Sequence, residues 1–118
     1  MILSREAILK AEDLSFEIVD VPEWGGEVKV TTLTGTERDA FESSLIDQKR
    51  GGNKVNTTNI RAKLVSMACV DDDGKRIFTP ADIEILGSKS ASALDRIFTV
   101  AQRLSKLTEA DVEELSGN

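Results

Sequence analysis

Two short segments with alternating apolar residues, separated by a Gly-Gly pair, limit the fold of this chain more than any other feature. In LSFEIVDV, the side chains of Leu14, Phe16 and Ile18 fall on one face of an extended strand. The segment EVKVTTL alternates in the same way after PEWGG. These two runs predict one β-hairpin over about residues 14–33. Because the connection is longer than two residues, the turn type stays open.

The rest of the chain has helical apolar spacing and signals for helix starts. The clearest apolar stripe lies over residues 88–107 and consists of Leu94, Ile97, Phe98, Ala101 and Leu104. Thr34 and Glu37 form a capping-box pattern, and Thr79 precedes Pro80 at another predicted start. The predicted helices cover residues 4–13, 34–45, 59–70, 79–87, 88–107 and 108–116, with a tight turn over 70–78. We therefore expect a mainly α protein of the α+β class. It would be a single domain over 1–118, with five to six helices and one N-terminal β-hairpin.

Composition and charge narrow the possible partners. The chain has 118 residues, of which only 4% are aromatic, so its core is predicted to consist mostly of aliphatic residues and alanine. Its net charge is −6, from 21 acidic and 15 basic residues. This charge disfavours non-specific binding to nucleic acid and to anionic membranes. The sequence contains no apolar run of membrane-spanning length. We expect neither nucleic acid nor a membrane as a partner.

The side chains needed for most catalytic and metal sites are missing. There is no histidine, and Cys69 is the only cysteine, which fits a reducing cytoplasm. The DDDG segment could suggest calcium, but an EF-hand alignment places Cys69 and Pro80 where the loop needs acidic ligands. Neither Gly-Gly pair lies in a phosphate-loop pattern. We therefore predict no catalytic residue, no cofactor and no metal, so the chain is not expected to be an enzyme.

Three segments are candidates for binding a protein partner. Trp24 at the hairpin turn either packs back onto a helix or is presented to a partner. The predicted mobile loop over about 48–58 begins a basic run that could contact an acidic protein surface, another copy of the chain or nucleic acid. The predicted acidic helix over about 108–116 has a short apolar side. The candidate partner-binding residues are Trp24, Lys49, Arg50, Lys54, Val112 and Leu115.

The order of three motifs resembles the tail assembly chaperones of long-tailed bacteriophages and prophages. The first motif is VPEWGGEVKVTTLTGTERDAFE. It is followed by NIRAKLVSMACVDDDGKRIFTPADIEILG and then by SASALDRIFTVAQRLSKLTEADVEEL. The resemblance runs from about Ser4 to Leu115 and is weakest over 48–58. No single motif is catalytic, so the resemblance depends on their collinear order.

The resemblance implies a non-enzymatic role in phage tail morphogenesis in the host bacterial cytoplasm. Members of that family are thought to bind the tape measure protein, to recruit major tail (tube) subunits, to self-associate and to be absent from the finished virion. In many members a ribosomal frameshift also yields an extended isoform. Two alternatives remain: a structural minor tail or completion protein, and a small nucleic-acid-binding phage regulator acting through residues 49–63.

Overall fold

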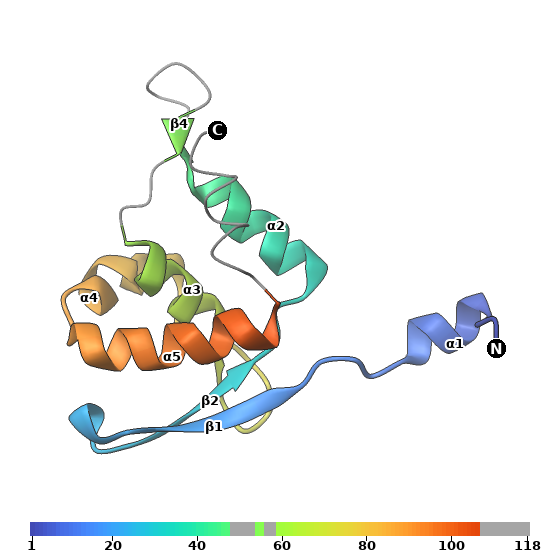
Figure 1. Cartoon of the computed structure of the whole chain (residues 1–118), viewed down its shortest axis with the longest axis horizontal. Coiled ribbons are helices and arrows are strands. Elements are labelled where there is room, and N and C mark those ends of the chain that lie inside the picture. The colour runs from blue at the N-terminus through green and yellow to red at the C-terminus, as the bar shows by residue number, and fades with distance from the viewer. Residues whose placement is uncertain (48–53, 56–58, 107–118) are drawn as a thin grey trace.

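The computed structural model describes residues 1–47, 54–55 and 59–106, and its described part belongs to the α+β class (Figure 1). The α-helices are α1 (Arg5–Lys10), α2 (Gly35–Ser44), α3 (Ile60–Ala68), α4 (Ile83–Gly87) and α5 (Ala91–Leu104). Two 3-10 turns are η1 (Pro22–Trp24) and η3 (Pro80–Asp82). The strands are β1 (Phe16–Val21), β2 (Gly26–Thr31), β3 (Ile46–Asp47), β4 (Lys54–Val55) and β5 (Cys69–Val70).

The predicted hairpin is present and is formed by β1 and β2. The strands pair antiparallel, from Phe16 opposite Thr31 to Val21 opposite Gly26. The connection is the 3-10 turn η1, followed by Gly25 in the left-handed conformation with φ of 75°. Glycine adopts this conformation without the steric cost that a Cβ would add. The turn type that the sequence left open is thus a 3-10 turn closed by glycine.

A third strand extends the sheet, which differs from the prediction. The helix predicted over 59–70 ends at Ala68, and Cys69 and Val70 continue as β5 beside β2, in the order β1-β2-β5. Val30 pairs with Cys69, and Lys29 pairs with Val70. The sequence has neither Gly nor Pro at this boundary, so no local signal ends the helix. Pairing with the free edge of β2 satisfies the backbone groups that a longer helix would otherwise have satisfied.

The acidic segment after β5 forms the tight turn that the sequence predicted. The carboxylate of Asp71 accepts hydrogen bonds from the backbone N–H groups of Asp73 and Lys75, at 2.9 and 3.0 Å. Gly74 has φ of 80°, and the chain returns to form a bridge between Val70 and Arg76. The Asp71 side chain therefore shapes the turn, which is the common role of Asx residues in turns.

Most predicted helix starts have the expected caps. The Thr34 hydroxyl accepts from the Glu37 amide at 3.1 Å, and the Glu37 carboxylate accepts from the Thr34 amide at 2.9 Å. Ser4 caps α1 through the amide of Ala7. Thr79 is the N-cap of η3 and Pro80 follows it at the first position, as predicted, and the Asp82 carboxylate accepts from the Thr79 amide at 2.8 Å.

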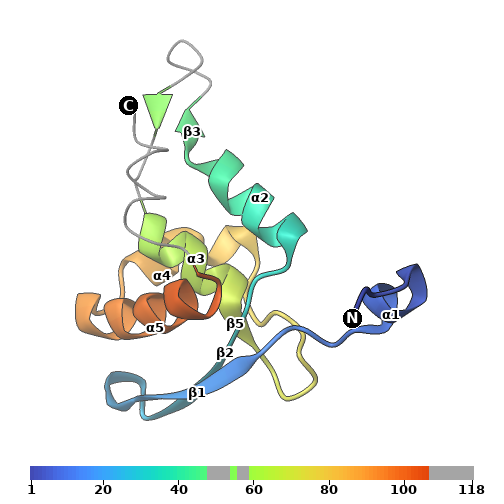
Figure 2. The same cartoon turned by 45° about the vertical axis from the view of Figure 1, so that its right-hand side comes forward.

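The core lies between one face of the sheet and the helices. In Figures 1 and 2, α3, α4 and α5 lie on one side of the β1–β2 ribbon, and α2 extends from the end of β2. The largest fully buried side chains are Phe41, Leu45, Leu64, Ile97, Val21, Val30, Val65 and Cys69. The apolar stripe predicted on α5 is confirmed: Leu94, Ile97 and Ala101 are buried, and Phe98 and Leu104 pack against the core. The core is aliphatic and alanine-rich, as the composition indicated.

Two predicted segments fall wholly or mostly outside the described residues. The loop over 48–58 lies outside them except for Lys54–Val55, which pairs as β4 with β3. The acidic helix over 108–116 lies entirely outside the described part.

Candidate partner-binding surfaces

The hairpin turn is held against the body of the protein. Trp24 is partly buried and packs against the core cluster. Of the two arrangements that the sequence allowed for Trp24, the structure has the one in which the indole packs back onto the body. A partner could therefore contact only the exposed part of this side chain.

Two ion pairs join helix α5 to the hairpin. Arg96 contacts the Glu23 carboxylate with its two terminal guanidinium nitrogens, at 2.6 and 3.1 Å. Arg103 contacts both oxygens of Glu17 at 2.9 and 2.7 Å. The two arginines are seven residues apart, so they lie on the same side of the helix. Exposed pairs of this kind add little stability, but they connect both ends of the hairpin to α5, and the Arg96–Glu23 pair has bidentate geometry.

The Glu23–Arg96 contact also affects the titration of both groups. The hydrogen bond from Arg96 holds the pKa of the Glu23 carboxyl below its usual value. The same hydrogen bond raises the pKa of the Arg96 guanidinium. Both groups therefore stay charged throughout the neutral pH range, and the contact at the hairpin turn persists there.

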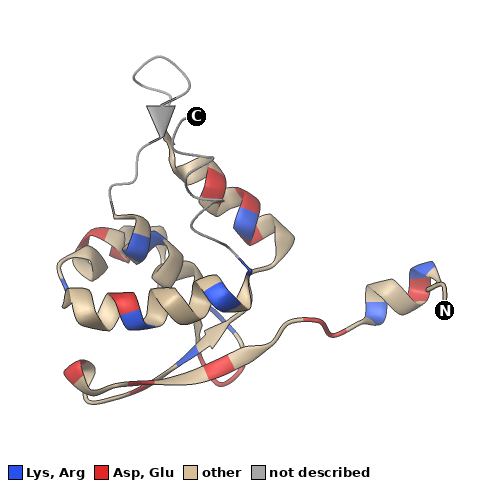
Figure 3. Cartoon of the chain, in the orientation of Figure 1, with Lys and Arg blue, Asp and Glu red and all other residues tan. Residues whose placement is uncertain are grey.

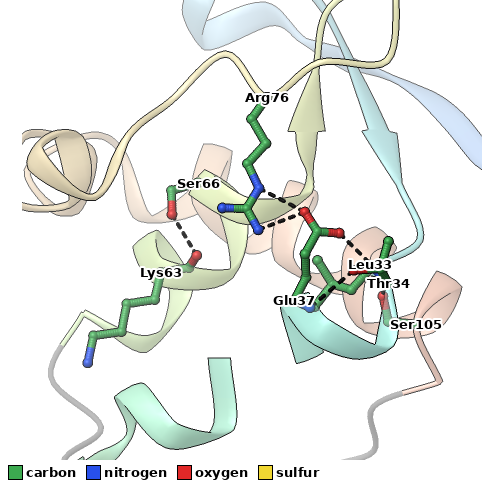
Figure 4. Close-up of polar contacts among 7 residues, drawn as sticks. All are labelled: Leu33, Thr34, Glu37, Lys63, Ser66, Arg76 and Ser105. Atoms are coloured by element: carbon green, nitrogen blue, oxygen red, sulfur yellow. Dashed lines mark hydrogen bonds and ion pairs between the residues drawn. The ribbon is translucent and has the colours of Figure 1, made fainter. Parts of the chain in front are cut away.

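A second polar cluster joins the acidic turn, α2 and the end of α5 (Figure 4). Arg76 contacts the Glu37 carboxylate at 2.7 Å, and the Ser105 hydroxyl accepts from the Leu33 amide at 3.0 Å. Burial alone would raise the pKa of Glu37, but hydrogen bonds from the Thr34 amide and from Arg76 outweigh it and lower the pKa. These contacts connect segments that lie far apart in the sequence.

The other candidate residues are placed only in part. Lys54 lies on β4, where its backbone pairs with Asp47. Lys49, Arg50, Val112 and Leu115 lie outside the described residues. The partner-binding role proposed for all six candidates stays a prediction.

Cys69 lies in the core. Its side chain is fully buried, and burial raises the pKa of the thiol to about 12. The thiolate is the reactive form of cysteine, so this residue is protonated and unreactive at neutral pH.

The sheet has an apolar outer face that the sequence analysis did not identify as a surface. We define the outer sheet face as Phe16, Ile18, Lys29, Val70 and Ile77. Strand pairing places Phe16, Ile18, Lys29 and Val70 on the side away from the helices. A hollow of about 400 Å³ lies here, lined by Ile18, Glu27, Val28, Lys29, Val70, Asp71, Asp72 and Ile77. The sequence contained one indication of this face: β1 has apolar side chains on both of its sides, and only one side can pack against the helices.

Beyond the sheet, the N-terminal arm extends away from the body. We define the N-terminal arm as residues 1–15, which include α1. Every side chain of the arm is exposed, and α1 has no buried residue. Figures 1 and 2 both show α1 separated from the rest of the molecule. Its large apolar residues are Met1, Ile2, Leu3, Ile8, Leu9 and Leu14.

Two further properties concern the described residues only. No helix in residues 1–47 and 59–106 is long and apolar enough to cross a membrane. Within the same described part, no three cysteine, aspartate or glutamate side chains gather as a metal-binding group.

Comparison with known proteins identifies a similar fold. No protein-family model matches the chain, and no curated protein matches it in sequence. Among solved structures, the tail assembly chaperone of bacteriophage HK97 is similar, with a TM-score of 0.58 and 16% sequence identity. The match covers 84% of this chain and 94% of the HK97 protein. At this identity the similarity shows the fold alone, so the chain has a fold like that of a phage tail assembly chaperone.

Proposed function

We propose that this chain is a phage tail assembly chaperone that acts in the cytoplasm of the host bacterium. In this role it binds the tape measure protein, recruits tail tube subunits and leaves before the virion is complete. The observation that carries the proposal is the fold shared with the HK97 chaperone over most of both chains. The collinear motifs in the sequence support the same family independently of that comparison.

The chemistry of the described residues is compatible with this role. A chaperone of this kind works by mass action, because binding an aggregation-prone client lowers the concentration of free client. Such binding requires accessible apolar surface rather than an activated side chain. The structure has such surface on the outer sheet face and on the N-terminal arm, whereas its only thiol is buried and protonated. The proposed function therefore includes no catalytic step.

The expected distribution of the protein during infection provides a test. We expect the chain to be abundant in infected or induced cells and absent from purified virions, because a chaperone is released once the tail is built. Quantitative mass spectrometry of lysates and of purified particles measures both amounts. The major tail protein serves as the control for recovery of tail components.

Two outcomes would contradict the proposal in different ways. A fixed number of copies in every virion would show a structural tail or completion protein. Normal tail assembly by a phage that lacks the gene would exclude an essential role in morphogenesis.

A further inference from the structure

We propose that the N-terminal arm binds the outer sheet face of a second copy of the chain. This inference rests on the proposed function only for the expectation of self-association, and it names the two surfaces that would meet. Among the described residues, the chain carries an apolar segment that packs on no other element and an apolar face that no element covers.

The arm has the properties of a segment that acquires its partner from another molecule. Helix α1 has six residues, and helices of that length are marginal in water without tertiary contacts. It has a serine N-cap, an acidic residue in its first turn and a basic residue in its last turn. Nevertheless its two largest apolar side chains, Ile8 and Leu9, are 57% and 66% exposed. Burying them in a groove would stabilise both the helix and the complex.

The outer sheet face provides a groove of suitable chemistry. Ile18 and Ile77 are both about half exposed beside the hollow, at 49% and 48%. Val70 contributes apolar surface beneath them. The Lys29 amine lies 4.2 Å from the centre of the Phe16 ring, so its charge is directed to that ring. The groove is therefore of mixed chemistry, with the apolar side chains of Ile18, Val70 and Ile77 beside charged side chains.

Charge favours the docking of helix α1 itself. The rim of the hollow carries the carboxylates of Glu27, Asp71 and Asp72. Helix α1 has a basic residue at each end, Arg5 and Lys10, and one internal acid, so its net charge is +1 (Figure 3). The acids Glu12 and Asp13 follow the helix and would have to lie outside the acidic rim. When the apolar side of α1 lies in the groove, its two basic ends can reach the acidic rim. Opposite charges at an interface favour the correct register and faster association.

The direction in which the arm leaves the sheet favours binding to the groove of a second copy over binding to the groove of the same copy. The backbone and hydroxyl of Ser15 are hydrogen-bonded to Thr31 and Thr32 at the end of β2. These bonds direct the chain outward along the strand. The following segment, residues 11–14, has neither glycine nor proline to favour a reversal. Successive copies joined arm to groove would form a closed ring or an open chain.

Two surface variants and a control test this inference. The arm variant is Ile8→Ser with Leu9→Ser, and the groove variant is Ile77→Glu, which adds an acid to the acidic rim. The control is Ile85→Ser on α4, an equally exposed isoleucine outside both surfaces. Sedimentation equilibrium measures the mass of each protein, and circular dichroism verifies that each is folded. We expect both surface variants to self-associate at least about tenfold more weakly than the parent and the control.

Mixing the two variants tests whether the arm binds the groove of another copy or the groove of its own copy. The arm variant keeps its groove and the groove variant keeps its arm, so the mixture should form a heterodimer that neither protein forms alone. That heterodimer should weaken as salt is raised. No association in the mixture, or parent-like mass of the arm variant, would overturn the inference. Client capture by the arm variant is measured separately, so the proposed function can survive that failure.

Discussion

Replacing Phe41 with alanine is expected to lower the free energy of unfolding by about 3–5 kcal/mol. Phe41 lies on α2 with only 1% of its surface exposed, and it is among the largest fully buried side chains. Removing the ring leaves a cavity that the surrounding aliphatic side chains can only partly fill. Because a domain of this size is stable by about 5–15 kcal/mol, the variant would lose a large part of its stability.

A matched control is available in the same chain. Phe16 lies on the outer sheet face with 58% of its surface exposed, and the Lys29 amine lies over its ring. We expect Phe16→Ala to cost less than about 1 kcal/mol. Denaturant unfolding followed by circular dichroism measures both variants. Equal losses for the two phenylalanines would contradict the packing described here.

The second large effect concerns the reactivity of Cys69. Burial raises the pKa of its thiol from 9.0 to about 12, which lowers the thiolate fraction at neutral pH by roughly a thousandfold. We expect a thiol reagent at pH 8 to modify the native protein at least that much more slowly than the denatured chain. Because Cys69 is the only cysteine, the signal has a single source, and Cys69→Ala provides the blank. Rapid modification of the native protein would show that the site is open to solvent.

The same pKa predicts how stability responds to alkaline pH. Below pH 9 the thiol is protonated in both the folded and the unfolded chain, so its contribution does not change. Above pH 9 the unfolded thiol ionises, whereas the folded one stays protonated up to about pH 12. Stability should therefore fall as pH rises through this window, by up to about 1.4 kcal/mol per pH unit. The Cys69→Ala variant should lack this part of the alkaline decrease.

Features that depend on neighbours in the sequence were predicted well. The capping box of Thr34 and Glu37 and the apolar stripe of α5 depend on residues within a few turns, and both are confirmed. The hairpin is confirmed for the same reason, because its two strands flank one short turn. In each case local spacing and local hydrogen bonds agree with the final fold.

Features that depend on distant partners were not predictable in this way. Strand β5 exists because Cys69 and Val70 meet the edge of β2, about forty residues earlier in the chain. Sequence periodicity could not decide which side of β1 is buried, because Phe16 and Ile18 on one side are as apolar as Val19 and Val21 on the other. The structure buries the valines and exposes the larger pair.

The contacts between α5 and the hairpin also depend on residues that are distant in the sequence, so they could not be predicted. Arg96 and Arg103 contact glutamates 73 and 86 residues away. Neither composition nor local spacing predicts which arginine pairs with which glutamate. The sequence identified Trp24 as unusual, and the structure packs its side chain against the core cluster. The outer sheet face and the N-terminal arm could not be recognised from the sequence, because only the fold determines which side of the sheet the helices cover (Figures 1 and 2).

Co-expression with the tape measure protein of the same phage tests the central claim most directly. The measurement is the fraction of tape measure protein that stays soluble and elutes in a complex with this chain. We expect most of it to be captured with the parent chain, and little with Phe41→Ala, whose fold is destabilised. A tape measure protein that aggregates equally with and without the parent chain would contradict the account.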